Sequence, residues 1–462
     1  MRFSLALILL LLCAPALAQD AGEAGPADAD GEVASSDDPS KPEATPTRVP
    51  IEEIRRYVAV FNAVRDAYVE PVEDRALMQS AIRGLLLGLD PHSTYFDSKD
   101  AAAFDEQATG AYAGIGVELQ QQPDNTLRVI APIDDTPAAR AGIRAGDVII
   151  AVDGKPIGGA DAMEPLRGKP GTTLVLTLVR EGVAKPFDVS LTRETIRVAS
   201  VRSRMLEPGY GYVRISTFQA DTGADFQNQL DKLQAKGPLR GLVLDLRSNP
   251  GGLLLSAVQV ADELLEKGNI VSTRGRIAVS DSRFDATPGD RLGGAPVVVL
   301  VDAGSASASE VLAGALRDNR RARIVGSRTF GKASVQTVLP LDNGDSVKLT
   351  TARYYTPSGR SIQASGIVPD TLLRAEVAEG EAAATGFDYS EAELPGHLRG
   401  DEEGMEGYAA GEVLEGDKPI EAALAELKKA AGAAPAAAAE DNGNREASLP
   451  PRPSFPHSAQ PL

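Results

Sequence analysis

The chain has 462 residues, of which 43% are apolar, and this length predicts two or three domains with a sizeable core plus tails. Its 47 basic and 65 acidic side chains give a net charge of −18, which argues against nucleic acid and anionic membrane surfaces as main partners. The acidic residues are concentrated in the flanking regions, so they indicate more about solubility than about substrate.

The N-terminus has the pattern of a secretory signal peptide. Residues 1–18 combine a positive Arg2, an apolar run and an Ala-x-Ala cleavage site. Cys13 raises the alternative of a lipoprotein, but Leu12 is too large for the residue just before a lipidated cysteine. Cleavage would remove the only cysteine, leaving neither a disulfide nor a thiol nucleophile. We therefore expect an exported protein, located in the periplasm, and no later run is apolar enough to span a bilayer.

A linker and a helical region follow. Residues 19–49 lack apolar periodicity and are rich in Ala, Asp, Glu, Pro and Ser, so we expect disorder. Within residues 50–105, helical spacing of apolar residues predicts one helix from Pro50 and a second over Asp74–Leu89, ended by Asp90-Pro91. Amphipathic helices of this size need a partner surface, and we favour a second copy of the chain over the body of the same molecule.

Residues 106–192 contain short strands separated by Gly, Pro and Asp turns, with a short helix at Pro137–Ala141. This region resembles a PDZ domain, because Gly114-Ile115-Gly116-Val117 stands where that family has its carboxylate-binding loop and an A-G-I-R-A-G-D-V-I segment follows. Small residues there let successive amides converge on the C-terminal carboxylate of a peptide, which adds to the sheet as a strand.

Residues 193–375 alternate apolar strands with helices, which predicts parallel βα units and an α/β core. The expected strands are 211–215, 241–247, 296–302 and 323–326, and the expected helices are 218–233, 253–265 and 305–317. Asn343-Gly344 between two strand-like runs predicts a hairpin. The remaining residues, 376–462, are acidic or rich in Ala and Pro, so we expect them to be largely disordered, with one amphipathic helix at 419–431.

Three serines, Ser305, Ser307 and Ser309, stand where an apolar strand ends and a helix begins. Ser307 and Glu310 form an S-x-x-E capping box, which is enough to explain the serine. However, a hydroxyl beyond the carboxyl end of a parallel strand lies where such sheets bind ligands, and the helix N-terminus favours a developing oxyanion. A glycine-rich turn, Asn249-Pro250-Gly251-Gly252, ends a neighbouring strand and would let backbone amides approach the same point.

A nucleophilic serine needs a base, and two of the three histidines, His397 and His457, are poor candidates because they lie in the flanking regions. His92 remains an alternative base, although its place after the Asp90-Pro91 break favours a role in fixing a turn. Lys332 has no acid within five residues, and burial would give it a neutral amine near pH 7. A surface lysine is the commoner case, but Gln336 lies four residues on, on the same face, where its carbonyl oxygen could orient the amine.

Three segments, D-A-G-S-A-S-A-S-E, L-D-L-R-S-N-P-G-G and G-K-A-S-V-Q, together resemble the carboxyl-terminal processing peptidases, or tail-specific serine proteases. The likeness extends over residues 50–372. It implies Ser307 as nucleophile, Lys332 as general base and Gln336 as its orienting residue. It also implies an oxyanion hole formed by the backbone amide of Ala308 and by that of Gly251 or Gly252.

The resemblance also implies that a bound substrate tail activates the enzyme through the PDZ domain. Arg167 is a candidate contact between that domain and the peptidase core, with a solvated surface arginine as the alternative. The expected substrates are proteins with apolar C-termini, and the sequence leaves open whether an adaptor delivers them. No nucleotide, metal or haem motif is present in the sequence, and the expected mechanism needs no cofactor.

Two other hypotheses remain. In the first, the PDZ domain makes the chain a binding protein or adaptor with an inert peptidase-like fold, although the intact Ser, Lys and Gln argue against it. In the second, a Ser/Lys hydrolase acts on small esters or amides and leaves the PDZ domain without a role. The preferred reading is an exported serine endopeptidase that selects proteins by their apolar C-terminal tails.

Overall fold

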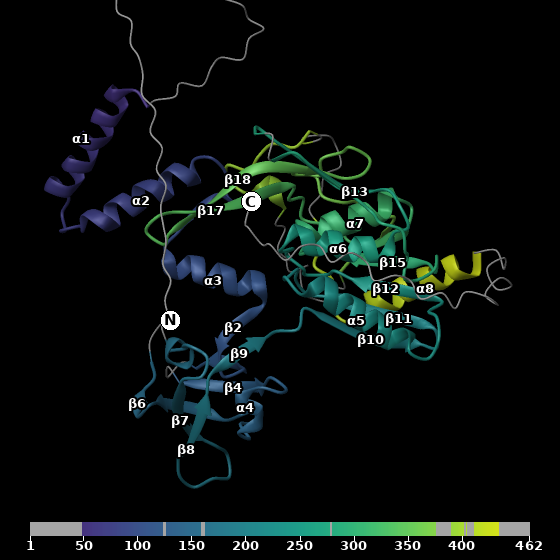
Figure 1. The fold of residues 1–462 in the computed structure, drawn as a ribbon, viewed down its shortest axis with the longest axis horizontal. Coiled ribbons are helices and arrows are strands. Elements are labelled where there is room, and N and C mark those ends of the chain that lie inside the picture. Colours follow the sequence, from purple (N-terminus) through teal and green to yellow (C-terminus); the bar gives the residue numbers. More distant parts are fainter. Residues whose placement is uncertain are drawn as a thin grey trace, which may run out of the picture. The chain divides into compact units, whose positions relative to one another are not determined.

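The structure is a computed structural model, and it describes residues 49–122, 126–158, 162–277, 280–375, 390–401, 403 and 411–433 (Figure 1). The predicted signal peptide and most of the linker lie outside these ranges. The chain divides into two compact units, the first ending at Pro71 and the second beginning at Val72. None of the helices in the described ranges combines the length and apolarity that crossing a membrane requires.

In the first unit the described structure is one helix, α1 (Ile51–Ala67), as the sequence predicts. Glu52 and Glu53 in its first turn interact favourably with the helix dipole. None of its residues is buried. The large apolar side chains that stay exposed are Ile51, Ile54, Tyr57, Val58 and Val60. A helix with this many exposed apolar side chains has the composition of an interaction surface.

The second unit begins with α2 (Asp74–Leu87), β1 (Thr94–Phe96) and α3 (Ser98–Thr109). The sequence predicts α2, which ends two residues earlier than expected, but it did not predict α3. Asp97 caps α3, because its carboxylate accepts from the backbone amides of Lys99 and Asp100. Gly110 ends this helix in the left-handed conformation and turns the chain into the next domain.

The region with PDZ-like strands forms a domain with its own core. β2 (Ala111–Gly114) pairs with β9 (Glu194–Arg197), and a separate sheet has the strand order β3-β4-β5-β7-β8, with β6 on β5. The members of this sheet are β3 (Val117–Gln121), β4 (Leu127–Pro132), β5 (Val148–Val152), β6 (Lys155–Pro156), β7 (Thr173–Val179) and β8 (Phe187–Thr192). The short helices are α4 (Pro137–Arg140) and a 3-10 turn at Glu164–Leu166. Leu174, Leu176 and Leu178 alternate into the core, as expected for a strand with one buried face.

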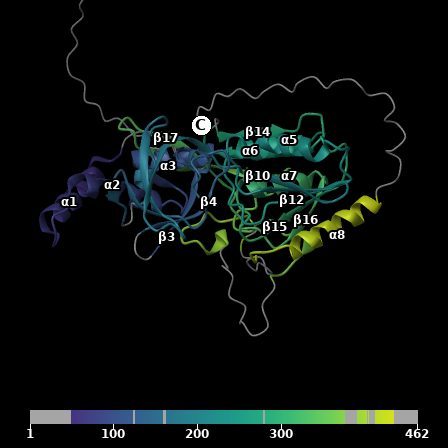
Figure 2. The same ribbon diagram turned by 90° about the horizontal axis from the view of Figure 1, so that it is seen from below.

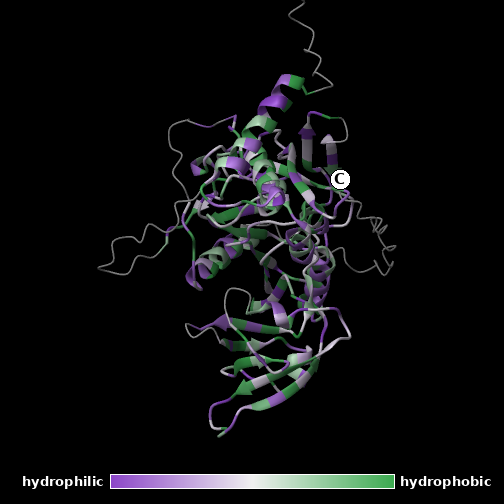
Figure 3. Ribbon diagram, turned by 90° about the vertical axis from the view of Figure 1, so that its left-hand side faces the viewer, coloured by the Kyte–Doolittle hydropathy of each residue, from purple (hydrophilic) through white to green (hydrophobic). Residues whose placement is uncertain are grey.

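The predicted α/β fold of the peptidase-like core is confirmed. Its main sheet has the order β10-β11-β12-β15-β16-β19, in which β10 is antiparallel and the others are parallel. The strands are β10 (Val201–Glu207), β11 (Tyr210–Ile215), β12 (Gly241–Asp245), β15 (Val297–Val301), β16 (Ala322–Gly326) and β19 (Thr371–Leu372). Both β12 and β15 are buried throughout, and apart from Asp245 at the end of β12 their residues are uncharged and mostly apolar, as expected for strands covered on both faces. Figure 3 colours the chain by hydropathy, with hydrophobic residues in green.

Helices cover both faces of this sheet. α5 (Thr222–Gln234), α6 (Leu254–Leu264) and α7 (Ala308–Asp318) pack on one face, and α8 (Lys418–Ala433) lies alone on the other (Figure 2). α7 begins three residues later than the predicted Ser305, because Ser307 has a positive φ of 53° that a helix does not accept.

A second sheet packs beside the first and has the order β1-β18-β13-β14, with β17 also pairing β18. The Asn343-Gly344 turn joins β17 (Ser334–Pro340) to β18 (Ser346–Tyr355), which confirms the predicted hairpin. The sequence did not predict β13 (Asn269–Gly275) and β14 (Ser282–Asp285). β1 pairs antiparallel with β18, so the segment after α2 is bound to this hairpin.

The predicted amphipathic helix near the C-terminus is present as α8. Its Ile420, Ala423 and Leu427 pack against Tyr210 and Val298 of the sheet. Glu391 and Leu414 are also buried, at 0% and 3% exposure. The described segments 390–401 and 411–433 therefore belong to the folded core, although the composition of residues 376–462 predicts a largely disordered tail. The rest of that region lies outside the described residues.

Candidate active site

The three serines before α7 differ sharply in their surroundings. Ser305 and Ser309 are fully buried, and their hydroxyls donate to the carbonyl oxygens of Leu246 and Asn249 at 2.7 and 2.9 Å. Ser307 is partly exposed and sits on the sharp turn between β15 and α7, with φ 53° and ψ −114°. Such a conformation is costly for a non-glycine residue and is common at functional sites. Of these three serines, Ser307 is the one that is not buried.

The glycine-rich turn after β12 packs directly on Ser307. A Cβ at Gly251 would lie 2.9 Å from the Cβ of Ser307 and 3.0 Å from the amide nitrogen of Ala308, so only glycine fits there. The Gly251 amide donates to Asn249 Oδ1 at 2.9 Å. Within the described residues, the amides of Gly252 and Ala308 have no hydrogen-bond acceptor. Two backbone donors near Ser307 are thus available to an incoming oxygen.

Two buried side chains hold the backbones of Ser307 and Lys332 together. Glu310 Oε2 accepts from the amide of Ser307 at 2.8 Å and from the amide of Lys332 at 3.0 Å. Tyr354 Oη lies 3.2 Å from the carbonyl oxygen of Ser307 and 2.6 Å from that of Lys332, and it donates to this pair of acceptors. Residues 25 positions apart in the sequence are therefore neighbours in space.

The amine of Lys332 has two oriented partners. Its Nζ donates to Gln336 Oε1 at 2.6 Å and to the carbonyl oxygen of Ser334 at 3.2 Å. Burial lowers the pKa of Lys332 to about 8, and Lys348 adds to this effect, while the charges of Glu391, Glu310 and Asp90 oppose it. About a tenth of the amine is consequently neutral at pH 7, far more than for an exposed lysine.

Glu310 and Tyr354 are site residues that the sequence analysis did not identify. Glu310 also accepts from Thr329 Oγ1 and from the Gly331 amide at 2.8 Å. Burial raises the pKa of this carboxyl to about 7, and the four hydrogen bonds act in the opposite direction. The S-x-x-E motif pointed to Glu310 only as a helix cap, and nothing in the local sequence links it to residue 332.

Among the described residues, neither His92 nor His397 forms a hydrogen bond with Ser307, Lys332 or Gln336. His92 Nε2 lies 2.8 Å from Glu391 Oε2, and its amide donates to Asp90. His397 Nε2 lies 3.0 Å from Glu403 Oε1. His457 lies outside the described residues. Among the described residues there is no cluster of His, Cys, Asp and Glu that could hold a metal ion.

In the PDZ-like domain, Gly114 to Val117 connect β2 to β3. Ile115 is buried, and Gly116 has φ 77° with its carbonyl accepting from the hydroxyl of Thr136 at 3.0 Å. Arg167 is half exposed, forms an ion pair with Glu106 of α3 and lies 5.8 Å from the centre of the Tyr112 ring. Its contacts thus lie at the junction of α3 with the domain, and a contact with the peptidase core remains a prediction.

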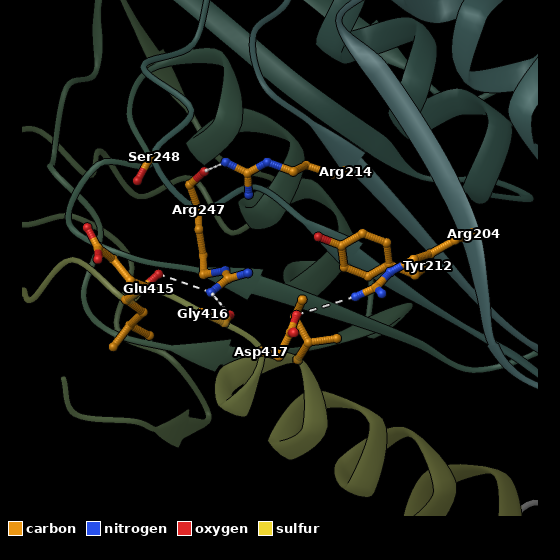
Figure 4. Close-up of a pocket in the computed structure, with 10 residues that line it drawn as sticks. Arg204, Tyr212, Arg214, Arg247, Ser248, Glu415, Gly416 and Asp417 are labelled. Atoms are coloured by element: carbon orange, nitrogen blue, oxygen red, sulfur yellow. Dashed lines mark hydrogen bonds and ion pairs between the residues drawn. The ribbon is translucent and has the colours of Figure 1, made fainter. Parts of the chain in front are cut away.

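A cavity of about 400 Å³ lies behind the glycine-rich turn and contains many charges (Figure 4). Arg247 Nη1 donates to the carbonyl oxygens of Leu414 and Gly416, both at 3.0 Å, and its Nη2 pairs with the buried Asp245 at 2.7 Å. Arg204 pairs with Asp417, and Arg214 with Asp245. Each of the three arginines that line the cavity, Arg204, Arg214 and Arg247, therefore has a partner within the protein. We interpret the cavity as the place where Arg247 binds the segment 414–416, and we call this arrangement the clasp.

Sequence families match three successive parts of the chain. The activating protease CtpB N-terminal domain matches residues 22–100, the PDZ domain matches residues 113–191, and peptidase family S41 matches residues 209–373.

Curated relatives cover most of the chain. It is 44% identical over 385 residues to the carboxy-terminal-processing protease of Bartonella bacilliformis, covering 82% of this chain and 88% of that protein. It is 36% identical over 314 residues to carboxy-terminal processing protease CtpA of Bacillus subtilis, covering 67% and 66%. It is also 37% identical over 337 residues to the chloroplastic C-terminal processing peptidase of Tetradesmus obliquus, covering 68% and 72%.

Proposed function

Because this chain belongs to the carboxy-terminal processing proteases of peptidase family S41, and is thus a serine-type peptidase acting on proteins, we propose that a Ser307/Lys332 dyad carries its chemistry. One observation carries this proposal: the backbone amides of Ser307 and Lys332 both donate to Glu310 Oε2, which holds the two residues side by side. The lysine amine in turn donates to Gln336 Oε1 at 2.6 Å. The expected product is a pair of protein fragments, formed through an acyl-enzyme intermediate.

In the proposed mechanism the neutral amine of Lys332 takes the proton of the Ser307 hydroxyl as its oxygen attacks the scissile carbonyl. The protonated lysine then gives that proton to the leaving amine, and water repeats the cycle on the acyl-enzyme. Gln336 accepts a hydrogen bond from Lys332 and limits the rotation of the amine. A pKa of about 8 suits a base that works near neutral pH.

For the oxyanion hole we assign the amides of Ala308 and Gly252. The sequence left Gly251 and Gly252 as alternatives. Gly252 is preferred because the Gly251 amide already donates to Asn249, whereas the Gly252 amide has no acceptor among the described residues. Donors that are fixed before the reaction stabilise the developing negative charge without reorganisation.

The PDZ domain is assigned the recognition of apolar C-terminal tails through Gly114 to Val117. Arg167 would transmit tail binding from this domain to α3, because it forms an ion pair with Glu106 of that helix. An adaptor that delivers substrates is compatible with this arrangement. The exposed apolar side chains of α1 support a homodimer formed through the N-terminal helices.

Export is proposed from the sequence of residues 1–18, with the periplasm as destination. Relatives occur in bacteria and in a chloroplast, both of which have compartments reached by translocation. Cell fractionation of the full-length chain beside a variant without residues 2–18 tests this point. Equal recovery of both forms from the cytoplasm would contradict it.

The central test compares the wild type with Ser307→Ala and Lys332→Ala on two reporter proteins. One reporter ends in an apolar tail and the other in Asp-Asp, and fragments are identified by mass spectrometry. We expect the wild type alone to cut, with preference for the apolar tail. Near-wild-type turnover by Lys332→Ala would contradict the proposed dyad. Tail binding without any cleavage by the wild type would favour an adaptor, or a protease that needs a partner.

A further inference from the structure

The turn between α2 and β1 is connected to the proposed base by an unbroken chain of hydrogen bonds. Lys332 Nζ donates to Gln336 Oε1 at 2.6 Å, and Gln336 Nε2 donates to Thr350 Oγ1 at 3.1 Å. Thr350 Oγ1 donates to Asp90 Oδ1 at 3.0 Å. Asp90 is 4% exposed, so the chain ends on a carboxylate that is shielded from water.

The turn holds Asp90 firmly. Its Oδ1 accepts from the amides of His92 and Ser93, both at 2.9 Å, and its Oδ2 accepts from Ser93 Oγ at 2.7 Å. Ser93 Oγ accepts in turn from the Thr350 amide at 3.0 Å. Burial raises the pKa of Asp90, but these hydrogen bonds and that of Thr350 outweigh it and place the pKa below the usual value. The acceptor is therefore ionised at neutral pH.

The direction of this chain matters for Gln336. The oxygen and nitrogen of a glutamine amide are similar in shape, so its hydrogen-bond partners decide which one faces which way. Because the hydroxyl hydrogen of Thr350 is committed to Asp90, Thr350 Oγ1 can only accept from Gln336. The amide nitrogen must then face Thr350, and the carbonyl oxygen must face Lys332.

Sheet pairing keeps these groups in register. Gln336 on β17 is the direct cross-strand partner of Thr350 on β18. Thr94 of β1 pairs with Lys348 of β18, two residues before Thr350 in that strand. This pairing anchors the Asp90 turn next to Thr350. Ser334 Oγ also accepts from Gln336 Nε2, at 3.0 Å, so Thr350 is one of two hydroxyls on this amide.

We infer that Thr350, directed by Asp90, is a positioning residue that sets the orientation of the Gln336 amide and thereby aims the amine of Lys332. This inference rests on the proposed function, because it needs Lys332 to act as base and Gln336 to orient it. Among the described hydrogen bonds Thr350 does not contact Lys332 directly, so it acts through Gln336, and Asp90 orients Thr350 in turn.

The test compares Thr350→Val, which removes the hydroxyl, with Thr350→Ser, which retains it. The control is Thr351→Val on the same strand, since Thr351 Oγ1 bonds only to Thr337 Oγ1 among the described residues, at 2.7 Å. For Thr350→Val we expect kcat on the apolar-tailed reporter to fall by roughly ten- to a hundredfold with KM unchanged, the range seen on loss of an orienting partner. Thr350→Ser and Thr351→Val should stay near the wild type, and the Tm of both valine variants should shift alike.

A double-mutant cycle with Gln336→Ala separates positioning from general damage. Since Thr350 acts through Gln336, Thr350→Val should lower kcat no further in the Gln336→Ala background. A kcat for Thr350→Val equal to that for Thr351→Val, or a loss that persists without Gln336, would overturn the inference. Wild-type kcat for Gln336→Ala would instead remove Gln336 from the proposed function.

Discussion

Glu310 binds the backbone of Lys332 with the same carboxylate that binds the backbone of Ser307, and it has no exposed surface. A residue of α7, the helix that follows the proposed nucleophile, thus binds a segment that begins 19 residues later, at Thr329. Its partners are all donors: the amides of Ser307, Gly331 and Lys332 and the hydroxyl of Thr329. A carboxylate is the side chain that can accept from four donors at once.

Glu310→Gln should therefore impair both stability and turnover. The variant keeps the shape of the side chain, but its NH₂ group cannot accept a hydrogen bond. In the place of Oε2 it would face the amides of Ser307 and Lys332, and in the place of Oε1 it would face the Gly331 amide and the Thr329 hydroxyl. We expect a loss of about 2 kcal/mol in the free energy of unfolding, the usual cost of leaving buried donors unsatisfied. We also expect kcat to fall by at least about tenfold, because the proposed nucleophile and the proposed base lose the carboxylate that binds both of their backbones.

Urea unfolding and steady-state kinetics measure the two effects. Glu393→Gln is a suitable control, because Glu393 is exposed and its Oε2 accepts only from the Ser390 amide in the described hydrogen bonds. Wild-type kcat for Glu310→Gln in a folded protein would show that the shared carboxylate is not needed for the geometry of the site.

The pH dependence of activity should follow the titration of Lys332. The neutral amine is the reactive form, so kcat/KM should rise about tenfold per pH unit at acidic pH and level off above the pKa of about 8. Lys332→Arg should be inactive throughout, since arginine does not lose its proton in proteins. The measurement is a profile of kcat/KM between pH 5.5 and pH 9.5 with the apolar-tailed reporter.

Changing a neighbouring charge tests whether this rise of kcat/KM at acidic pH, the acidic limb of the profile, belongs to Lys332. Lys348 lowers the pKa of Lys332, so Lys348→Met should move the limb to higher pH. Lys348 lies over the rings of Phe96 and Phe104, which methionine can also cover. An unchanged limb in Lys348→Met, or a limb that survives in Lys332→Arg, would assign the titration to another group.

The sequence predicted the parts of this structure that are written in local patterns. The continuous apolar runs of β12 and β15 indicated buried parallel strands, and Asn343-Gly344 marked the hairpin. Ser307, Lys332 and Gln336 were found because each stands in a short motif with a chemical meaning. In the structure Glu310 joins the backbones of Ser307 and Lys332, and the Lys332 amine bonds to Gln336, while the catalytic roles of the three residues remain a prediction.

Long-range links were not predictable from local sequence. The bond between Asp90 and Thr350 joins residues 260 positions apart, and it depends on the pairing of β1 with β18. The segment around Leu414 is held mainly through its backbone, so it leaves no side-chain pattern in the sequence. α3 was missed for a related reason, because none of its residues is buried and its apolar periodicity is weak.

Tail selection by the PDZ domain should depend on Gly116. This residue has φ 77°, and a Cβ there would lie 2.3 Å from Cβ of Thr136, so Gly116→Ala should distort the loop from Gly114 to Val117. We expect the affinity for an apolar-tailed peptide to fall at least about tenfold, a loss of about 1.4 kcal/mol. Isothermal titration of the peptide measures it.

Gly154→Ala provides a matched control within the same domain. Gly154 also has a positive φ, of 73°, but a Cβ there would meet no atom within 4 Å. Both variants strain the backbone, and only the one at Gly116 disturbs the loop that is proposed to bind the tail. Equal affinity losses in the two variants would show that backbone strain, and not the shape of this loop, accounts for the effect.

The clasp around Arg247 should contribute strongly to stability. Arg247 is 6% exposed and neutralises Asp245, which is fully buried, while also binding the carbonyl oxygens of Leu414 and Gly416. Arg247→Met removes the cation and leaves Asp245 with Arg214 and the hydroxyl of Tyr212. We expect a loss of about 3–5 kcal/mol in the free energy of unfolding, because an incompletely compensated charge stays buried.

The double variant Asp245→Leu/Arg247→Met distinguishes charge from packing. Replacing a whole buried ion pair by apolar side chains is often neutral, so the double variant should recover much of the stability that Arg247→Met loses. The segment at 414–416 would still lack its arginine, so limited proteolysis should cut there faster in both variants than in the wild type. If the double variant is as unstable as the single one, the hydrogen bonds to Leu414 and Gly416, and not the buried charge, carry the energy of the clasp.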